Sequence, residues 1–279
     1  MKVVILGAKG MLGTALVNEF TGKHEVVAMG RDELDIASSE DIAKTITSDV
    51  DVIINAAAWN DMDAAEADLD RAMINNASPL ASLADIADMM GMILVQFSSE
   101  HVFSGKGSGG NKENERTEPL SIFGRAKERA EKFSLEDNDK TYLIRTSRLF
   151  GPVGTSENAG SSFVDGVIRK AQAEGKVSAV HDEVASPSYA PDVAKAVREI
   201  IENKKPYGVY HVVNNGVATW YQLAKKAVEL SGQNAEVTAI ARRDEPLAAP
   251  RPRYGMLVNT KLPPLRNWED ALAEYVKSL

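Results

Sequence analysis

A short apolar run near the start of the chain leads directly into closely spaced glycines. Val3–Leu6 is followed by Gly7, Gly10 and Gly13, a G-x-x-G-x-x-G pattern, and a helical pattern runs over Met11–Phe20. Small residues at a strand-to-helix junction let the backbone approach a pyrophosphate, and the free N–H groups of the helix point at the phosphates. The feature predicts a dinucleotide site. A tightly packed turn without a ligand is the alternative.

The rest of the chain alternates between short apolar runs and longer amphipathic stretches. Continuous apolar strands separated by helices indicate a parallel sheet covered on both faces, so we expect a doubly wound, Rossmann-like α/β fold. After about residue 150 the alternation loosens. We therefore expect an NAD(P)-binding Rossmann domain over residues 1–150. A smaller C-terminal substrate-binding lobe is expected over residues 151–279, with some segments returning to the sheet.

Composition excludes several classes of protein. The 279 residues contain no cysteine, which rules out disulfides, cysteine-ligated zinc and a cysteine nucleophile. The net charge of −8 disfavours nucleic acid and anionic membranes as partners. No run approaches the ~18 apolar residues of a membrane span. We expect no metal site, a cytoplasmic location, and a monomer or homodimer.

The end of the second expected strand discriminates between cofactors. NAD sites usually carry an acid there, whereas the 2′-phosphate of NADP calls for an arginine. This chain has Arg31, which can pair with a phosphate through two N–H groups. The arginine favours NADPH, with NADH as the alternative cofactor and a solvated surface side chain as the alternative role. Asp35 and Ile36 lie further along and are expected beside the adenine.

Motifs along nearly the whole chain are similar to one known family. The chain resembles the extended short-chain dehydrogenase/reductases, and more narrowly the dTDP-4-dehydrorhamnose reductase family. The order and spacing of the motifs make the resemblance specific. The matching segments are Gly7–Gly13, Gly30–Ile36, Asp51–Ala58, Asp63–Glu66, Phe97–Gly105, Pro119–Lys127, Ile144–Ser147, Ser186–Tyr189 and Thr219–Tyr221.

The resemblance implies reduction of the 4-keto group of a nucleotide-linked 6-deoxysugar by hydride from a nicotinamide. In the family a tyrosine protonates the carbonyl oxygen, a lysine lowers the pKa of that tyrosine and holds the ribose, and a Ser/Thr hydroxyl bonds the carbonyl. Ser99 falls at the hydroxyl position and Lys127 at the lysine position. The expected cofactor-binding residues are Gly7, Gly10, Met11, Leu12, Gly13, Arg31, Asp35, Ile36, Asn55, Ala56, Ala57, Ala58 and Lys127.

The catalytic tyrosine position holds Phe123, which has no hydroxyl to donate. General acid catalysis is worth typically 10² to 10⁴-fold, roughly 3–5 kcal/mol, whereas positioning contributes about 7–11 kcal/mol. The loss of the acid therefore predicts a slow enzyme and does not require an inactive one. His101 is a speculative replacement acid, with a packed or solvent-facing histidine as the alternative. A neighbouring Arg148 would lower the pKa of His101 and weaken this hypothesis.

Two further positions depart from the family. Glu100-His101 stands where the family has Asp-Tyr, and Arg148 where it often has Trp, so the expected substrate pocket is less aromatic and more basic. Arg251 and Arg253 lie on a proline-stiffened loop that can clamp a nucleotide diphosphate, with solvated side chains as the alternative. The expected substrate-binding residues are Glu100, His101, Arg148, Phe163, Ser186, Tyr189, Arg251 and Arg253.

The predicted function is therefore an NADPH-dependent reductase of a nucleotide-linked 4-keto-6-deoxysugar, slow or with a shifted substrate. A non-catalytic nucleotide-binding or regulatory protein of the same fold is the alternative. The retained glycines, Ser99 and Lys127 favour the enzyme, whereas Phe123, His101 and Arg148 favour the non-catalytic protein or a shifted substrate.

Overall fold

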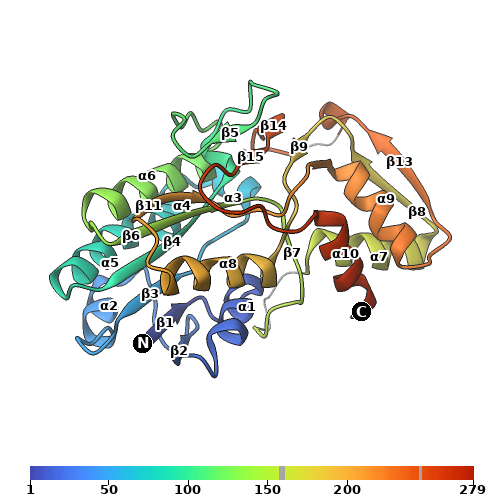
Figure 1. Cartoon of the computed structure of the whole chain (residues 1–279). Coiled ribbons are helices and arrows are strands. Elements are labelled where there is room, and N and C mark those ends of the chain that lie inside the picture. The colour runs from blue at the N-terminus through green and yellow to red at the C-terminus, as the bar shows by residue number, and fades with distance from the viewer. Residues whose placement is uncertain (157–160, 245–246) are drawn as a thin grey trace.

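A six-stranded parallel sheet forms the centre of the molecule, in the strand order β11-β6-β4-β3-β1-β2 (Figure 1). The computed structural model describes residues 1–156, 161–244 and 247–279. Each neighbouring pair in the sheet runs parallel, which confirms the doubly wound α/β fold. The strands are β1 (Lys2–Leu6), β2 (Glu25–Met29), β3 (Val52–Asn55), β4 (Ile93–Ser99), β6 (Thr141–Thr146) and β11 (Gly208–His211).

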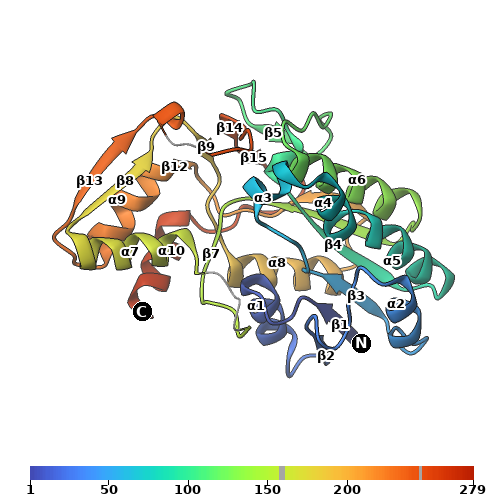
Figure 2. The same cartoon turned by 180° about the vertical axis from the view of Figure 1, so that it is seen from behind.

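Helices cover both faces of the sheet (Figure 2). Val3 and Ile5 of β1 pack in one apolar cluster with α1 and α8, whereas Val4 and Leu6 pack in another with α2, α5 and α6. This alternation explains why the strands are apolar at every position, because successive side chains point to opposite faces. The helices of this part are α1 (Met11–Phe20), α2 (Ser39–Thr45), α3 (Met62–Ala67), α4 (Leu69–Asn76), α5 (Ser78–Met89), α6 (Ile122–Glu136) and α8 (Ala190–Glu202).

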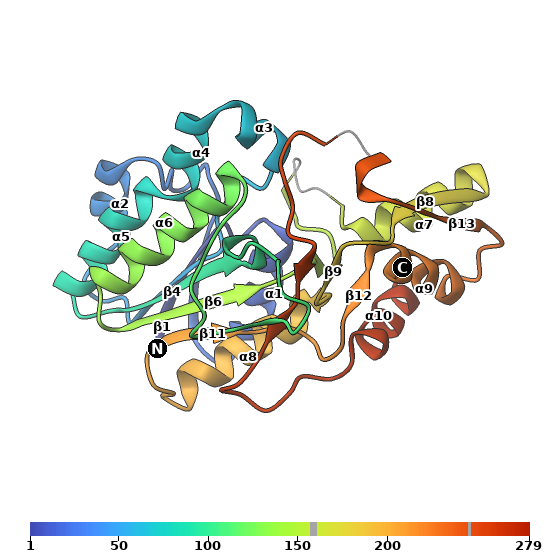
Figure 3. The same ribbon diagram turned by 90° about the horizontal axis from the view of Figure 1, so that it is seen from above.

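A second region lies beside the sheet and has its own apolar core (Figure 3). Phe150, Tyr189 and Tyr275 pack together at its centre, with ring centres 5.4 to 6.2 Å apart. The division at residue 150 stays a prediction, and α8 and β11 belong to the sheet although they come later in the chain. The elements of this region are α7 (Phe163–Glu174), β8 (Lys176–Val180), α9 (Trp220–Leu230), β13 (Glu236–Ile240) and α10 (Trp268–Lys277).

Short strands outside the central sheet form small sheets that connect the two regions. Because η1 follows directly on β4 and β7 follows closely on β6, these connections lie at the carboxyl ends of the sheet strands, where ligand sites of this fold class form. In the part of the chain that the structure describes, no helix has the length and apolar character needed to span a membrane. The remaining elements are η1 (Glu100–Val102), β5 (Asn111–Lys112), β7 (Leu149–Phe150), β9 (Val184–Ala185), β10 (Ser188–Tyr189), β12 (Ala218–Thr219), η2 (Arg242–Asp244), β14 (Tyr254–Gly255) and β15 (Leu257–Val258).

Candidate active site

The glycine turn between β1 and α1 is shaped so closely that side chains do not fit. A Cβ on Gly13 would lie 2.0 Å from the carbonyl oxygen of Gly7, and a Cβ on Gly7 would lie 2.7 Å from the backbone of Ala57. Helix α1 begins after Gly10, and no side chain in the described part of the protein caps it. Because the N–H groups of a first helical turn have no partner within the helix, this uncapped end is a cradle that fits a pyrophosphate.

The segment after β7 packs against the same turn. Ser156 donates its backbone N–H to the carbonyl oxygen of Lys9 at 3.1 Å, and a Cβ on Gly154 would lie 2.4 Å from that oxygen. The second half of the chain therefore forms part of the wall of the cradle. Gly154 is absent from the sequence predictions, because a single glycine in an irregular segment carries no signal of what it will pack against.

Arg31, at the end of β2, is exposed. The two acids that follow it face Lys9 instead: the Lys9 ammonium lies 2.8 Å from the Glu33 carboxylate and 3.5 Å from Asp32. Glu33 also accepts the Gly30 N–H at 2.8 Å. No described residue forms an ion pair with Arg31, so its guanidinium fits a 2′-phosphate. Asp35 accepts the Ala37 N–H at 3.1 Å, and Ile36 packs at the edge of the core.

The end of β3 lies against the glycine turn. The buried Asn55 donates its side-chain amide to Gln96 at 2.8 Å and accepts the N–H of Ala57 at 3.1 Å. These bonds hold Ala56, Ala57 and Ala58 next to Gly7, whose Cβ position lies 2.7 Å from Ala57. Small side chains here leave the approach to the turn open, which agrees with the predicted cofactor role without testing it.

The structure brings the remaining catalytic positions together. Ser99, the last residue of β4, donates its hydroxyl to the Glu100 carboxylate at 2.6 Å. The Lys127 ammonium, buried on α6, donates to the Phe97 carbonyl oxygen at 3.5 Å and lies 5.9 Å from the centre of the Phe123 ring. Burial lowers the pKa of Lys127 to about 8, although the charge of Glu131 opposes the shift.

His101, on η1, lies next to the phenylalanine that replaces the tyrosine. Its ring meets the Phe123 ring edge-on, with centres 5.7 Å apart, and its Nε2 is 3.8 Å from the Glu100 carboxylate. Burial lowers the pKa of His101, the charges of Arg251 and Arg148 lower it further, and Glu100 opposes them. The imidazole is therefore mainly neutral near pH 7, so its protonation state disfavours the predicted role as an acid.

Arg148 stands in a left-handed backbone conformation (φ +41°) and fills the position where the family often has Trp. Its guanidinium donates to the carbonyl oxygens of Ala218 at 2.8 Å and Glu183 at 3.2 Å. It also lies 4.0 Å from the centre of the Trp220 ring. Burial lowers the pKa of Arg148 to about 10. An indole from the start of α9 thus lies against the side chain at position 148. Trp220 and Glu183 were not among the predicted site residues.

Three of the predicted substrate residues, Phe163, Ser186 and Tyr189, pack against other parts of the protein. The Phe163 ring packs on Trp220, with ring centres 4.6 Å apart. Ser186 accepts the N–H of Leu257 at 3.3 Å, and Tyr189 lies in the buried aromatic cluster. Both side chains are buried, so the structure gives them a framework position.

The two arginines of the proline-stiffened loop differ. Arg251 forms a bidentate ion pair with Asp63 of α3, at 3.0 and 2.8 Å. Arg253 is exposed, with its guanidinium 5.4 Å from the centre of the Tyr254 ring. Arg251 therefore joins the two regions, and Arg253 is the arginine of the pair that faces solvent. Asp63 falls within a family motif, but its partner could not be read from the motif.

Buried polar atoms without a hydrogen-bond partner among the described residues gather at the carboxyl ends of β4 and β6. They are the side-chain oxygens of Ser98, Thr146 and Ser147 and the Nδ1 of His101. The strand register sets Ser98 opposite Arg145 and Ser99 opposite Thr146. Buried polar groups in folded proteins are normally hydrogen-bonded, and ligands in open α/β sheets bind at this edge. The described residues contain no group of three His, Asp or Glu side chains placed to hold a metal ion.

The doubly wound sheet, the uncapped helix at the glycine turn and the buried lysine beside the end of β4 define a Rossmann-type nucleotide-binding protein of the dehydrogenase/reductase class. The family model described as "RmlD substrate binding domain" matches residues 1–279, so the chain belongs to this family. The family resemblance predicted from the sequence is confirmed.

Named relatives and solved structures match the chain over almost its full length. It is 29% identical to the spore coat polysaccharide biosynthesis protein SpsK of Bacillus subtilis, over 99% of this chain and 97% of that protein. It is 31% identical to a dTDP-4-dehydrorhamnose reductase of Mycolicibacterium smegmatis, over 100% and 86%. A dTDP-4-dehydrorhamnose reductase of Bacillus anthracis, solved in complex with NADP, superposes with a TM-score of 0.94 at 28% identity, covering 100% of this chain and 99% of that one.

Proposed function

We propose that this protein is an NADPH-dependent reductase of the 4-keto group of a dTDP-linked 6-deoxysugar. The observation that carries the proposal is the buried ammonium of Lys127, which donates to Phe97 two residues before Ser99 on β4, at the same sheet edge as the uncapped glycine cradle. The names of the relatives support the substrate class, and the NADP complex of the Bacillus anthracis enzyme supports the cofactor.

The residues present fit this cofactor. The glycine turn and the first turn of α1 would hold the pyrophosphate, and Arg31 would pair with the 2′-phosphate. Lys127 would hold the nicotinamide ribose, and the Ser99 hydroxyl would bond the substrate carbonyl. The bound nicotinamide supplies a hydride. The protein orients donor and ketone at the carboxyl edge of the sheet, and positioning of this kind contributes about 7–11 kcal/mol.

Phe123 sets the expected rate. Without the tyrosine hydroxyl the enzyme loses a general acid, an effect worth typically 10² to 10⁴-fold. Arg148 and Trp220 shape the sugar end of the pocket differently from a pocket with Trp at position 148. We therefore expect slow turnover and a preference within the class of dTDP-linked keto sugars that differs from that of tyrosine-containing relatives.

The test is NADPH oxidation with three dTDP sugars: dTDP-4-dehydrorhamnose, dTDP-4-keto-6-deoxy-D-glucose and dTDP-4,6-dihydroxy-2-methyloxan-3-one. We expect measurable turnover with at least one of them, and faster turnover by about 100-fold in Phe123→Tyr, the lower end of the range of general acid catalysis. Phe133→Tyr is the matched control, because it adds a hydroxyl to the same helix α6 near its other end.

Phe123 also favours the second candidate, a nucleotide-binding protein without turnover. If NADPH binds in a fluorescence titration and neither the parent chain nor Phe123→Tyr reduces any of the three sugars, this candidate replaces the reductase. Failure of NADPH and NADH to bind would refute the cofactor assignment. The oligomeric state and the cytoplasmic location stay predictions.

A further inference from the structure

We propose that the ammonium of Lys127 is the proton donor in this protein, in place of the tyrosine hydroxyl that Phe123 lacks. The inference rests on the proposed reductase function. It gives the lysine a chemical step in addition to holding the ribose, and it explains how a ketone is protonated in a pocket whose usual acid is missing.

Lys127 lies beside the residue that replaces the tyrosine. Lys127 lies one turn after Phe123 on α6, and its Nζ is 5.9 Å from the centre of the phenylalanine ring. Both residues are buried, with 6% and 5% of their surfaces exposed. The ammonium therefore lies beside the ring that stands in the place of the acid, at the carboxyl end of β4 where it donates to the Phe97 carbonyl oxygen.

The ammonium of Lys127 also has unused hydrogen-bonding capacity within the described residues. A lysine ammonium carries three donors, and Nζ makes one long bond, 3.5 Å, within the described residues. An N–H that is not held by the protein is available to a carbonyl oxygen or to a bridging water. The buried side chain thus has protons to give and an environment that does not stabilise its charge.

The carboxylate whose charge acts on Lys127, that of Glu131, is already paired with an arginine. Glu131, one turn further along α6, is held by two bonds from Arg145 of β6, at 2.8 and 2.6 Å, and both partners are buried. Its negative charge is therefore balanced by Arg145 rather than by a hydrogen bond to Lys127. Burial is the main cause that lowers the pKa of Lys127 to about 8, and Glu131 is the charge that opposes it. An acid works best when its pKa lies near the operating pH.

The other groups at this site are less suited to donate the proton. His101 of η1 is kept mainly neutral, because burial lowers its pKa. The Ser99 hydroxyl already donates to the Glu100 carboxylate at 2.6 Å. Glu66 of α3 faces the start of α6, where it accepts the N–H of Ile122 at 2.9 Å. Lys127 remains as the acid next to Phe123.

The step balances with the named cofactor. The keto carbon gains a hydride from the nicotinamide, the carbon–oxygen π bond breaks, and the oxygen takes a proton from Nζ. The products are a secondary alcohol, oxidised nicotinamide and a neutral Lys127 amine. The amine recovers its proton from water before the next turnover.

Lys127→Arg tests the step, because arginine keeps the positive charge but does not release a proton in proteins. We expect kcat of the parent chain to fall as pH rises above about 8, where Lys127 loses its proton. In Lys127→Arg we expect kcat to fall about 100-fold, the lower end of the range for a general acid, and the high-pH limb to disappear. NADPH affinity from fluorescence titration should change by less than about threefold if the charge alone holds the ribose.

Lys127→Arg in the Phe123→Tyr variant separates the role of Lys127 as a proton donor from the role of its positive charge. In Phe123→Tyr the tyrosine hydroxyl resumes the role of the acid, so Lys127→Arg should cost less than about tenfold there, against about 100-fold in the parent chain. Lys132→Arg is the matched control, since Lys132 lies on the same helix, is exposed and pairs with Glu128. It should leave kcat and its pH profile unchanged.

A direct titration decides the inference without turnover. In NMR spectra of chain labelled with ¹³C at lysine Cε, the signal that disappears in Lys127→Arg should titrate near pH 8, well below the ordinary 10.5. A lysine signal that titrates near its ordinary pKa overturns the inference, as does an unchanged kcat in Lys127→Arg. By contrast, absence of turnover in the parent chain and in Phe123→Tyr overturns the proposed function itself.

Discussion

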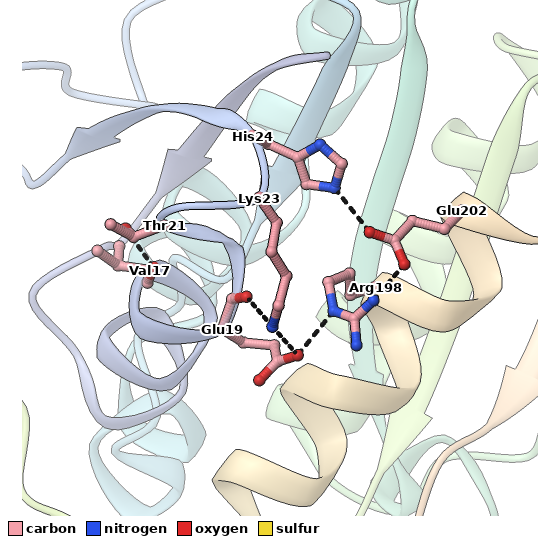
Figure 4. Close-up of polar contacts among 7 residues, drawn as sticks. All are labelled: Val17, Glu19, Thr21, Lys23, His24, Arg198 and Glu202. Atoms are coloured by element: carbon pink, nitrogen blue, oxygen red, sulfur yellow. Dashed lines mark hydrogen bonds and ion pairs between the residues drawn. The ribbon is translucent and has the colours of Figure 1, made fainter.

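The hydrogen-bonding of polar side chains differs between the two edges of the central sheet. The amino edge is where the strands begin, and the carboxyl edge is where they end. At the amino edge, Lys23 and Arg198 pair with Glu19, and His24 and Arg198 pair with Glu202 (Figure 4). These contacts join the end of α1 and the start of β2 to the end of α8. At the carboxyl edge, buried oxygens of Ser98, Thr146 and Ser147 have no partner within the described residues.

The difference separates stability from function. Paired surface charges hold secondary elements together and contribute little each, typically 0–1 kcal/mol. Unpaired buried polar groups destabilise a fold, so they persist where a ligand can satisfy them. The comparison predicts that effects on binding and turnover arise only at the carboxyl edge, whereas substitutions at the amino edge act on stability alone.

The largest expected effect is at the glycine turn. Gly13→Ala places a methyl group 2.0 Å from the Gly7 carbonyl oxygen, so the turn must shift. We expect NADPH affinity, measured by fluorescence titration, to fall by roughly 100-fold or more, equivalent to about 2.8 kcal/mol. Overpacking should also lower the free energy of unfolding, by about 1–3 kcal/mol.

Gly166→Ala is the control for that substitution. Gly166 lies within α7, and a Cβ there meets no described atom within 4 Å. The change should stabilise the protein by roughly 0.5–1 kcal/mol, since alanine favours a helix over glycine, and should leave NADPH affinity unchanged. An equal loss of affinity in both variants would contradict the role of the turn.

The second largest effect is a pH dependence of stability from His211, at the carboxyl end of β11. The side chain is fully buried, and burial and the neighbouring Arg145 lower its pKa below the ordinary 6.5, although Glu113 opposes them. As pH falls below about 6.5, the unfolded chain binds a proton that the native state excludes. The free energy of unfolding should therefore fall, by up to about 1.4 kcal/mol per pH unit for this group.

Urea unfolding at several pH values between about 7 and 5 measures this slope. His101 contributes with the same sign, because its pKa is lowered too. In His211→Gln the slope of the unfolding free energy against pH should decrease by up to about 1.4 kcal/mol per pH unit, the equivalent of one proton. The variant is expected to be less stable at every pH. A slope identical to that of the parent chain would show that His211 does not titrate on unfolding.

A smaller effect is expected at the ion pair that joins the two regions. Arg251 holds the pKa of Asp63 down at about 2, against an ordinary 3.8. The pair stabilises the native state above about pH 4, and its contribution is lost as pH falls through about 2. Because Asp63 is one-third exposed, Asp63→Asn should cost only about 1 kcal/mol near neutral pH, measured by urea unfolding. An unchanged stability would mean that the pair does not hold the regions together.

The smallest effect is expected at the amino edge. Arg198→Ala removes the contacts from α8 to Glu19 and Glu202 but leaves Lys23 on Glu19 and His24 on Glu202. We expect a loss of about 0.5–1 kcal/mol in thermal or urea unfolding. NADPH affinity and kcat should stay as in the parent chain. A change in either would contradict the prediction that the amino edge acts on stability alone.

Much of the fold could be predicted because its signals are local. An apolar run, a glycine turn and a helical period lie close together in the sequence, and they specify β1, the cradle and α1 through local hydrophobic pattern and backbone sterics. The missing tyrosine was visible for the same reason, since Phe123 and Lys127 belong to one motif on one helix. The residue types at these positions are properties of the sequence by itself.

The environment of those residues was decided only by tertiary structure. Arg145 donates two hydrogen bonds to the Glu131 carboxylate, and no carboxylate among the described residues is bonded to Lys127. Gly154 packs against the glycine turn, and Trp220 packs against Arg148. Asp63 accepts hydrogen bonds from the guanidinium of Arg251. Each of these contacts joins segments from separate parts of the chain. A local pattern specifies backbone conformation and residue type, whereas burial and charge partners depend on which distant segments meet.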